Sequence, residues 1–579
     1  MFTKTRAPWL NNYGSVPKTL EYFKGTMWEM VEEAADSRPD HIAYDFMGKS
    51  TPYKKFKSDV HACAKALRAA GVKPGDRVTV CMPNCPQAVV MFYAINLMGG
   101  VSNMVHPLSS ENEIQFYLNI SKSVCALTLD QFYPKFSEIR KNVPTLKTLV
   151  IASVKDELKP LLKLGYSLTE GKKLPKLPSE AEGKYITWKN FIAAGKNYRG
   201  KYICHKDKNE AAVILYSGGT TGTTKGILLS NLNLNALSAQ VISANPIYDK
   251  DDKILAVMPI FHGFGLGVSI HTFLSNAGRC VLVPRFTPKT YARDILKTRC
   301  NFIAGVPTLY EALLRQPEMK NADLSCLKGV FSGGDTLSAE LKKRFDRFLE
   351  DHGAKVVVRE GYGTTECVTA SCLTPLHLYK EGSIGQPFAD TYYKIVDVGT
   401  NIEVPYGTEG EICISGPTVM LGYLDNPEET HNTLRIHGDG RTWLHTGDLG
   451  IMDEDGFIYF RQRIKRMIIT SGYNVYPSQL ENVLEGCEAV QMACVIGVPD
   501  PYKIQKIKAF VTLAPGYQPV DETKELIFAY CRKNIAKYAM PYDIEFRDSL
   551  PTTLVGKVAY RVLEEEEEAK RKADTTATV

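Results

Sequence analysis

Hydrophobic residues recur along most of the chain in short runs separated by helical patterns. Between 52 and 70, Phe56, Val60, Cys63 and Leu67 fall on one helical face, and after the turn KPGD the run RVTVCM is typical of a strand. The same alternation continues to about residue 400, with further predicted strands in CALTL, TLVIAS, KILAVMP, RCVLVP, NFIAGVP and KVVV. Short β-branched runs between helices predict parallel sheets covered by helices, so the expected fold class is α/β.

The character of the chain changes near residue 462. A basic segment, RQRIKRMII, is followed by strand-like MACVIGV and KAFVTL, an amphipathic ETKELIFAYCRKNIAKY and a third strand in DIEFRD. These segments suffice for a compact α+β unit of about 115 residues. We therefore predict a large N-terminal domain of helix-covered β-sheets over 1–463 and a small α+β C-terminal domain over 464–579. The charged end, RVLEEEEEAKRKADTTATV, is expected to be a solvated tail with no packed role.

Composition indicates a folded, multidomain protein. The 579 residues are 44% hydrophobic and 23% charged, which is ordinary for globular chains. No apolar run reaches the ~18 residues of a membrane span, and the N-terminus, MFTKTRAPWLNNYG, lacks the apolar core of a secretory signal, so we expect a cytoplasmic location. The fourteen cysteines are scattered without a zinc or disulfide pattern, and we expect reduced thiols.

Positive charge is concentrated in one stretch. Residues 155–201 carry eleven Lys or Arg against five Asp or Glu, although the whole chain has a net charge of only +6. Leu, Tyr, Trp and Phe are interspersed with these charges, which would suit peripheral contact with the inner, anionic face of a membrane. A solvated surface insertion explains the same pattern, and the sequence leaves both open.

The segment YSGGTTGTTKG, residues 216–226, directly follows the apolar run AAVIL. Its glycines permit close backbone approach, its hydroxyls and backbone N–H groups can donate to phosphate oxygens, and Lys225 adds a mobile positive charge. These features predict a polyphosphate site. The segment is not a Walker A motif, because Lys225 follows Thr224 and precedes Gly226. Taken alone, it would be equally typical of a flexible surface loop.

Six further motifs follow in order, and together with the loop they carry a resemblance to a known family. They are MPIFHGFG, FSGGD, EGYGTTE, LHTGDLG, FRQRIKRMIITSGYNVYPSQLE and PTTLVGKV. The chain resembles the adenylate-forming (acyl-CoA synthetase, AMP-binding) superfamily, and it is most similar to the bacterial long-chain fatty acid CoA ligases. In such enzymes a carboxylate attacks the α-phosphorus of ATP, and the thiol of coenzyme A then attacks the resulting acyl adenylate.

The resemblance implies a role for each motif residue. The catalytic residues would be His262, Thr365, Glu366 and Lys557, with Glu366 and Thr221 as the ligands of Mg²⁺. Tyr362 would face adenine, Asp448 the ribose hydroxyls and Arg463 the ribose or phosphate. The remaining residues expected to bind ATP or coenzyme A are Ser217, Gly218, Gly219, Thr220, Thr221, Gly222, Thr224, Lys225, Gly333, Gly334, Asp335, Gly361, Gly363, Lys465, Ser471, Gly472 and Tyr473.

The family pattern also implies motion. The small C-terminal domain would be mobile: it would deliver Lys557 for adenylation and then turn about Lys465, which brings Ser471, Gly472 and Tyr473 to coenzyme A. The expected small molecules are therefore a fatty acid, ATP with Mg²⁺, and coenzyme A. No nucleic-acid partner is expected, and the sequence leaves open whether the chain forms a homodimer.

Departures from the commonest loop pattern bear on the substrate. Gly218 stands where relatives have Ser and Thr224 where they have Pro, yet Gly-Gly-Thr-Thr-Gly without the proline is similar to the fatty acid enzymes. A fatty acid is therefore the expected substrate. An aryl, bile or other carboxylic acid stays an alternative, as does a fatty acyl-AMP ligase. A non-catalytic binding scaffold is disfavoured because Glu366, Asp448, Arg463 and Lys557 are all present.

Overall fold

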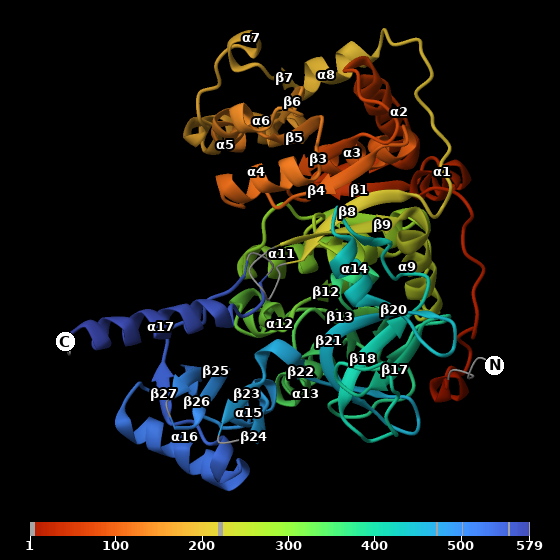
Figure 1. Ribbon diagram of the computed structural model, residues 1–579. Helices are drawn as coiled ribbons and strands as arrows, with labels where there is room; N and C mark the ends of the chain where they lie inside the picture. Colours follow the sequence, from red (N-terminus) through yellow and green to blue (C-terminus); the bar gives the residue numbers. More distant parts are fainter. Residues whose placement is uncertain (1–5, 218–223, 471–472, 501, 554–555, 578–579) are drawn as a thin grey trace.

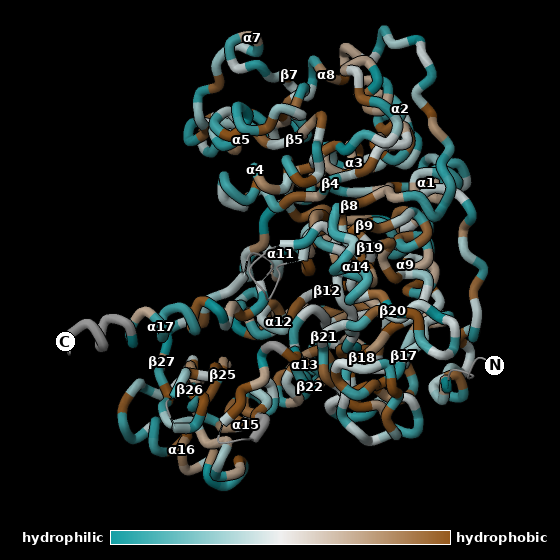
Figure 2. The backbone as a smooth tube through the Cα atoms, in the orientation of Figure 1, coloured by the Kyte–Doolittle hydropathy of each residue, from teal (hydrophilic) through white to brown (hydrophobic). Residues whose placement is uncertain are grey.

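Three β-sheets and a separate C-terminal unit make up the fold (Figure 1). The computed structural model describes residues 6–217, 224–470, 473–500, 502–553 and 556–577. Within these ranges, every helix is too short or too polar to cross a bilayer. Figure 2 shows hydrophobic residues gathered on the inner strands and hydrophilic residues on the outer helices and loops, which is the pattern expected of packed α/β layers.

The first sheet has nine strands in the order β16-β15-β14-β13-β12-β10-β11-β1-β2. Its central strands are parallel, whereas β2, β15 and β16 run antiparallel at the edges. The carboxyl ends of β13 and β14 lead into the FSGGD and EGYGTTE segments, so these two motifs lie side by side. The strands are β1 Ile42–Phe46, β2 Lys49–Pro52, β10 Lys253–Ala256, β11 Arg279–Leu282, β12 Phe302–Gly305, β13 Gly329–Ser332, β14 Val358–Tyr362, β15 Cys372–Leu373 and β16 Gln386–Pro387.

The second sheet has eight strands in the order β19-β9-β8-β4-β3-β5-β6-β7. Strands β8 and β9 form an antiparallel pair in which Ser217 is opposite Lys225, so the glycine-rich segment joins them. The strands are β3 Arg77–Cys81, β4 Val101–Met104, β5 Cys125–Leu129, β6 Thr148–Ala152, β7 Ile186–Thr187, β8 Ala211–Ser217, β9 Lys225–Ser230 and β19 Gly422–Tyr423.

Helices cover and separate these two sheets. Helix α3, Pro86–Leu97, is buried along its whole length, as expected for a helix that is apolar on all sides. Helix α2, Tyr53–Ala69, packs against it with the predicted face of Phe56, Val60 and Leu67. The other main helices are α1 Met27–Ser37, α4 Glu111–Ile120, α5 Tyr133–Ile139, α6 Pro160–Leu168, α8 Trp188–Gly195, α9 Asn231–Ser243, α11 Pro288–Thr298, α12 Pro307–Leu314 and α13 Ala339–Asp351.

The third sheet is antiparallel and was not predicted as a separate layer. It has the order β17-β18-β21-β20, with β22 paired to β21. Its register places Asp448 of β21 opposite Arg463 of β22, because a bulge lies next to this pair. The strands are β17 Tyr392–Val396, β18 Gly410–Ser415, β20 Leu434–Ile436, β21 Thr442–Met452 and β22 Ile458–Arg463, and helix α14, Pro427–Thr433, precedes β20.

The C-terminal unit has its own hydrophobic core, which includes Leu484, Val495, Ala509 and Ile527. A five-stranded sheet carries α15 Pro477–Glu485 and α16 Asp521–Asn534; its strands are β23 Ile468–Thr470, β24 Tyr473–Val475, β25 Val490–Asp500, β26 Ile504–Leu513 and β27 Asp543–Phe546. The predicted α/β class, with a large N-terminal part and a smaller C-terminal one, is confirmed. The boundary between 463 and 464 stays a prediction.

The charged C-terminal end is not a simple solvated tail, so that expectation was wrong. Tyr560–Ala577 form helix α17, which extends toward the C-terminus in Figure 1. Leu563 is fully buried. Glu567 forms an ion pair with Lys508 of β26, with 2.8 Å between Oε1 and Nζ. Leu563 and Glu567 are four residues apart, so they lie on the same face of the helix. This buried face is not evident in the sequence, because Glu567 belongs to a run of glutamates.

Candidate active site

A cavity of about 1180 Å³ lies where the large part of the chain meets the C-terminal unit. Its wall brings together residues that are far apart in the sequence: His262, Glu366, Asp448, Arg463 and Lys557. Strand ends and loops of all three N-terminal sheets reach this wall, and Thr553, Lys557 and Val558 line it from the C-terminal side. Many of the predicted site residues that the structure describes therefore line one space, whereas Thr224 and Gly333 are not on its wall.

Asp448 forms one corner of the cavity. Its side chain is almost fully buried, and Oδ2 accepts a 2.6 Å hydrogen bond from the Tyr362 hydroxyl. Arg463 Nε lies 3.3 Å from Oδ1, but this oxygen accepts no hydrogen bond. Burial raises the pKa of Asp448, while Arg463 opposes the rise. A buried carboxylate oxygen without a donor, on the wall of a cavity, suits a ligand that brings hydroxyl donors, as a ribose does.

A second corner joins Glu366 to the glycine-rich segment. The Tyr423 hydroxyl donates a 2.9 Å hydrogen bond to Glu366 Oε1, and Lys225 Nζ lies 5.0 Å from the centre of the Tyr423 ring. Lys225 also forms an ion pair with Glu429 of α14. Glu366 and Lys225 thus both contact Tyr423. A carboxylate and an ammonium group fit Mg²⁺ and phosphate oxygens respectively.

The Lys557 segment is docked against the N-terminal part of the chain. Thr308 Oγ1 donates a 2.8 Å hydrogen bond to the carbonyl oxygen of Gly556, and the backbone N–H of Val558 lies 3.4 Å from Asp335 Oδ2. A Cβ atom on Gly334 would lie 3.4 Å from Lys557 Cε and 3.9 Å from Nζ. Gly334 has a φ of +83°, so both its conformation and the lysine's approach favour glycine here.

Burial lowers the pKa of two basic side chains on the wall of the cavity, Lys557 and His262. It lowers the pKa of Lys557, which Asp335 partly restores. It also lowers the pKa of His262 to about 3, with a further contribution from the positive charge of Lys557. His262 is therefore a neutral imidazole at ordinary pH, and its Nδ1 accepts a 3.2 Å hydrogen bond from the backbone N–H of Phe264. Lys557 supplies the positive charge and His262 does not.

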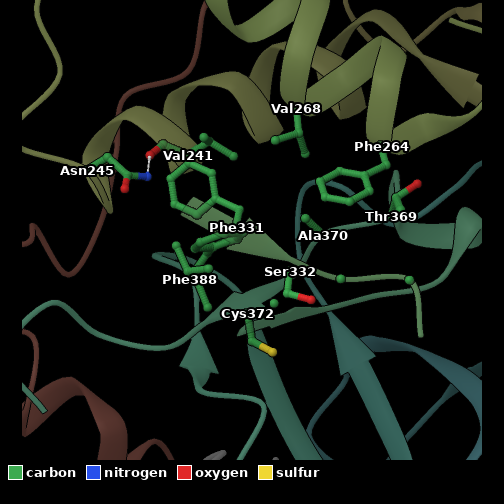
Figure 3. Close-up of a pocket in the computed structure, with 14 residues that line it drawn as sticks. Val241, Asn245, Phe264, Val268, Phe331, Ser332, Thr369, Ala370, Cys372 and Phe388 are labelled. Atoms are coloured by element: carbon green, nitrogen blue, oxygen red, sulfur yellow. Dashed lines mark hydrogen bonds between the residues drawn. The ribbon is translucent and has the colours of Figure 1, made fainter. Parts of the chain in front are cut away.

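An apolar pocket of about 40 Å³ adjoins the cavity (Figure 3). The two spaces share Ser332, Gly334 and Gly361 on their walls. Figure 3 shows Phe264, Phe331 and Phe388 around this pocket. The other lining residues are Val241, Asn245, Val268, Gly333, Thr369, Ala370, Cys372 and Leu373. The arrangement places a small apolar space beside a large, charged one, as a reaction between an apolar acid and a nucleotide requires.

Other predicted residues lie on or beside the same wall. Thr365, Gly361, Gly363 and Asp335 line the large cavity, as do Ser217 and Lys225 at the two ends of the glycine-rich segment. Gly363 is held close to the chain, since a Cβ atom there would lie 2.6 Å from the Thr369 carbonyl oxygen. Gly218, Gly219, Thr220, Thr221, Gly222, Ser471 and Gly472 lie outside the described residues. Lys465 follows the end of β22, and Tyr473 begins β24.

Four residues of the site were missed by the sequence reasoning: Thr308, Glu411, Tyr423 and Glu429. Thr308 is the second residue of helix α12, directly after the predicted strand segment NFIAGVP, whereas Tyr423 lies outside the motifs named above. Glu411 Oε1 accepts a 2.9 Å hydrogen bond from the Gly447 backbone N–H, next to Asp448. No spacing in the sequence connects these residues with their partners, because the contacts cross between sheets.

Comparisons with known proteins agree with this geometry. The family model described as AMP-binding enzyme matches residues 31–424, and the AMP-binding enzyme C-terminal domain matches residues 479–557. The chain belongs to the AMP-binding enzyme family.

Its relatives match along their full length. A long-chain-fatty-acid–CoA ligase of Bacillus subtilis is 35% identical over 573 residues, covering 97% of this chain and 99% of that protein. Another from Salmonella typhimurium is 31% identical over 580 residues, covering 98% and 99%.

Solved structures share the fold. The ATP-bound RpMatB-BxBclM chimera B1 has a TM-score of 0.81 at 25% identity, covering 94% of this chain and 99% of that one. The anthranilate CoA ligase AuaEII in complex with anthranoyl-AMP has a TM-score of 0.81 at 23% identity, covering 96% and 98%.

Proposed function

We propose that the chain is an ATP-dependent fatty acid CoA ligase. The observation that carries the proposal is the docking of Lys557 in the cavity that also holds Asp448, Glu366 and Lys225, beside an apolar pocket. The names of the two relatives support the choice of acid. The substrates would be a fatty acid, ATP and coenzyme A.

In the first half-reaction, a carboxylate oxygen of the acid attacks the α-phosphorus of ATP. A bond forms between the carboxylate oxygen and the α-phosphorus. The bond from the α-phosphorus to the oxygen that bridges it to the β-phosphorus breaks, and pyrophosphate leaves. Lys557 stabilises the negative charge that gathers on the reacting oxygens. Asp448 orients the ribose through Oδ1, which contacts Arg463 but accepts no hydrogen bond from the described residues, and Lys225, released from Glu429, holds the outer phosphates.

Glu366 is the residue that would hold Mg²⁺, which neutralises phosphate charge when bound, and Thr221 is proposed as a second ligand. In the second half-reaction, the thiolate of coenzyme A attacks the carbonyl carbon of the acyl adenylate. The carbonyl-to-oxygen bond then breaks and AMP leaves with both electrons. We propose that the C-terminal unit turns about Lys465 between the two steps, which withdraws Lys557 and brings the segment 471–473 to the site.

The acyl chain would enter the apolar pocket past Gly333 and Gly334. At about 40 Å³ the pocket has room for roughly three water-sized spheres. A long chain therefore requires movement of the side chains at its far end, which Figure 3 places at Val241 and Phe388. Burial of each added methylene contributes about 0.8 kcal/mol to binding. The affinity for the acid is therefore expected to rise with chain length once the side chains at the far end of the pocket move.

The range of acids that the enzyme activates tests the proposal directly. AMP release in the presence of coenzyme A is measured for acids from acetate to oleate, together with a coumarate and a bile acid. A maximum at about twelve to eighteen carbons, as methylene burial predicts, supports the proposal. Turnover only with the aryl or steroid acid would keep the adenylation chemistry and overturn the substrate.

Helix α6 is proposed as a contact with a membrane that supplies the acid. Leu161, Leu164 and Leu168 are 86%, 60% and 57% exposed, and their spacing places them on one helical face. Leu158, just before the helix, is buried and anchors it. The stretch 155–201, which contains this helix, carries eleven Lys or Arg. Exposed leucines among lysines suit an anionic bilayer surface, because the apolar face inserts while the charges meet the headgroups.

Vesicle co-sedimentation tests this contact. The full chain is expected to bind vesicles of anionic lipid, less so at high salt, and the double variant Leu161→Asp/Leu164→Asp is expected to lose binding. Leu378→Asp, which changes an exposed leucine elsewhere, is the matched control. Equal binding by the double variant and the control would refute the contact.

A further inference from the structure

Three buried side chains of the kinds that can ligate a metal meet in the third sheet, beside the large cavity whose wall includes His445. They are Cys413 on β18, His437 just after β20 and His445 on β21. All three are buried, and one ligand atom of each lies within 4.8 Å of the other two. The Nε2 atoms of the two histidines are 3.0 Å apart. The antiparallel register brings Cys413 opposite His445, so the backbone itself holds two of the three groups together.

Hydrogen bonds fix one of these imidazoles in the tautomer that a metal requires. His445 Nδ1 lies 2.8 Å from Glu411 Oε2, and a neutral ring at this contact carries its proton on Nδ1. Its Nε2 lone pair therefore points at His437. A carboxylate that accepts from the second ring nitrogen is the usual support of a metal-bound histidine. Among the described residues His437 Nδ1 has no hydrogen-bond partner, so this ring is free to move its proton to Nδ1 and turn the Nε2 lone pair inward.

The geometry and charge suit a divalent cation. Two nitrogens bound tetrahedrally to one Zn²⁺ at 2.0–2.1 Å stand roughly 3.3 Å apart, close to the 3.0 Å found here. The thiolate of Cys413 and the carboxylate of Glu411 together balance two positive charges in this buried place. The nearby Lys394 is already countered by Asp439, at 3.4 Å. A charge that is balanced in this way can be buried without a large penalty.

We propose that Cys413, His437 and His445 form a binding site for a thiophilic divalent metal ion of the Zn²⁺ class, with Glu411 as the residue that positions His445. Sulfur and imidazole ligands select such an ion over Mg²⁺ and Ca²⁺, which prefer oxygen. This site is distinct from the proposed Mg²⁺ site, which is at Glu366 beside the phosphates. Its fourth ligand is left to a small molecule such as water.

The same carboxylate connects this cluster to the nucleotide corner. Glu411 Oε2 contacts His445, while Oε1 accepts a 2.9 Å hydrogen bond from the backbone N–H of Gly447. The next residue is Asp448. A metal held by His445 therefore shares a support with the turn that places Asp448, and binding at the two places should be coupled. The metal site itself does not depend on which acid the enzyme activates.

The first test uses the full chain and two probes, Zn²⁺ and Co²⁺. After dialysis against excess Zn²⁺ and removal of free metal, elemental analysis is expected to find one ion per chain. Co²⁺ is expected to give the sulfur-to-metal charge-transfer absorption of a thiolate ligand. His437→Gln and Cys413→Ser should each lose at least ten-fold in affinity for Zn²⁺, whereas His352→Gln and Cys326→Ser, away from the cluster, should bind as the unchanged chain does.

The outcomes separate clearly. Absence of a stoichiometric ion in the unchanged chain, or Zn²⁺ affinity unaltered by both cluster substitutions, would overturn the proposal. If the cluster variants unfold, the cobalt spectrum of the unchanged chain decides, since a spectrum without thiolate absorption overturns the assignment of Cys413. A shift in AMP affinity on Zn²⁺ addition, absent in His437→Gln, would in addition support the coupling through Glu411.

Discussion

Thr308 at the start of α12 donates a 2.8 Å hydrogen bond to the carbonyl oxygen of Gly556, the residue before Lys557. This contact joins the N-terminal part of the chain to the C-terminal unit at the point where the lysine enters the cavity. Val558, on the other side of the lysine, approaches Asp335. The residues on both sides of Lys557 are therefore in contact with the N-terminal part of the chain, as the proposed role of this lysine in adenylation requires.

Thr308→Val should weaken this docking without changing the shape of the site much. Loss of one hydrogen bond corresponds to about 0.5–1.5 kcal/mol, so adenylation is expected to slow by roughly two- to ten-fold. Thioester formation from supplied acyl-AMP and coenzyme A should stay unchanged, because in the proposed rotation the C-terminal unit leaves this position before the second step. Equal slowing of both half-reactions would contradict the assigned role of the contact.

Lys557→Ala should separate the two half-reactions. Removing the positive charge that stabilises the reacting oxygens is expected to lower adenylation by at least ~10²-fold. The measurement is acid-dependent pyrophosphate release in the variant, beside conversion of supplied acyl-AMP to thioester. We expect the second reaction to persist. A variant that loses both steps to the same extent would show that the lysine does more than assist adenylation.

The pH dependence of adenylation should report the charge of Lys557. The required form is protonated, so the rate is expected to fall as pH rises through the pKa of this lysine. Burial lowers that pKa, which places the fall below pH 10.5, the ordinary value. Asp335 raises the pKa of Lys557, and Asp335→Asn should therefore move the fall to lower pH. The pyrophosphate-release profile of the two proteins checks this; an unmoved or upward-shifted fall would contradict it.

Tyr362→Phe should disturb the ribose corner. The change removes the 2.6 Å donor to Asp448 Oδ2 and leaves a buried carboxylate oxygen without it, at a cost of about 1–3 kcal/mol. The expected result is a rise of roughly ten-fold in the KM for ATP with little change in the KM for the acid. Initial rates at varied ATP and at varied acid distinguish these effects. A change confined to the KM for the acid would mean that Tyr362 contacts the acid rather than ATP.

Ala370→Phe should shorten the acyl chain that the enzyme accepts. Ala370 lines the apolar pocket, and a benzyl group would fill a space of about 40 Å³. We expect kcat/KM to fall at least ten-fold for dodecanoate and much less for acetate, since overpacking affects only acids that reach the pocket. Loss of activity with all acids alike would indicate general disruption, and unchanged chain-length preference would place the acyl site elsewhere.

Much of this arrangement could be predicted from the sequence, and the reasons are local. Strand runs such as RVTVCM and RCVLVP are short, apolar and β-branched, as buried parallel strands typically are, and they form β3 and β11. The motifs containing Glu366, Asp448 and Lys557 were each recognisable, and their order implied one site. KVVV was predicted as a strand, but only its last residue belongs to β14.

The parts that could not be predicted depend on contacts across the fold. The third sheet is made of strands between 392 and 463 whose order, β17-β18-β21-β20 with β22, depends on pairing between segments distant along the chain. Pairing of Asp448 with Arg463 depends on a bulge, and Tyr423 reaches Glu366 only because β19 joins the edge of another sheet. Helix α17 was hidden because its buried Leu563 is a single apolar residue before a run of glutamates.

The central claim is that one oxygen of a fatty acid attacks the α-phosphorus of ATP in this cavity. It is tested most directly by following that oxygen. Oleate labelled with heavy oxygen in its carboxylate is incubated with ATP, Mg²⁺, coenzyme A and the protein, and the products are weighed by mass spectrometry. The account predicts oleoyl-CoA together with AMP that carries one heavy oxygen. Unlabelled AMP, or ADP and phosphate in its place, would contradict it.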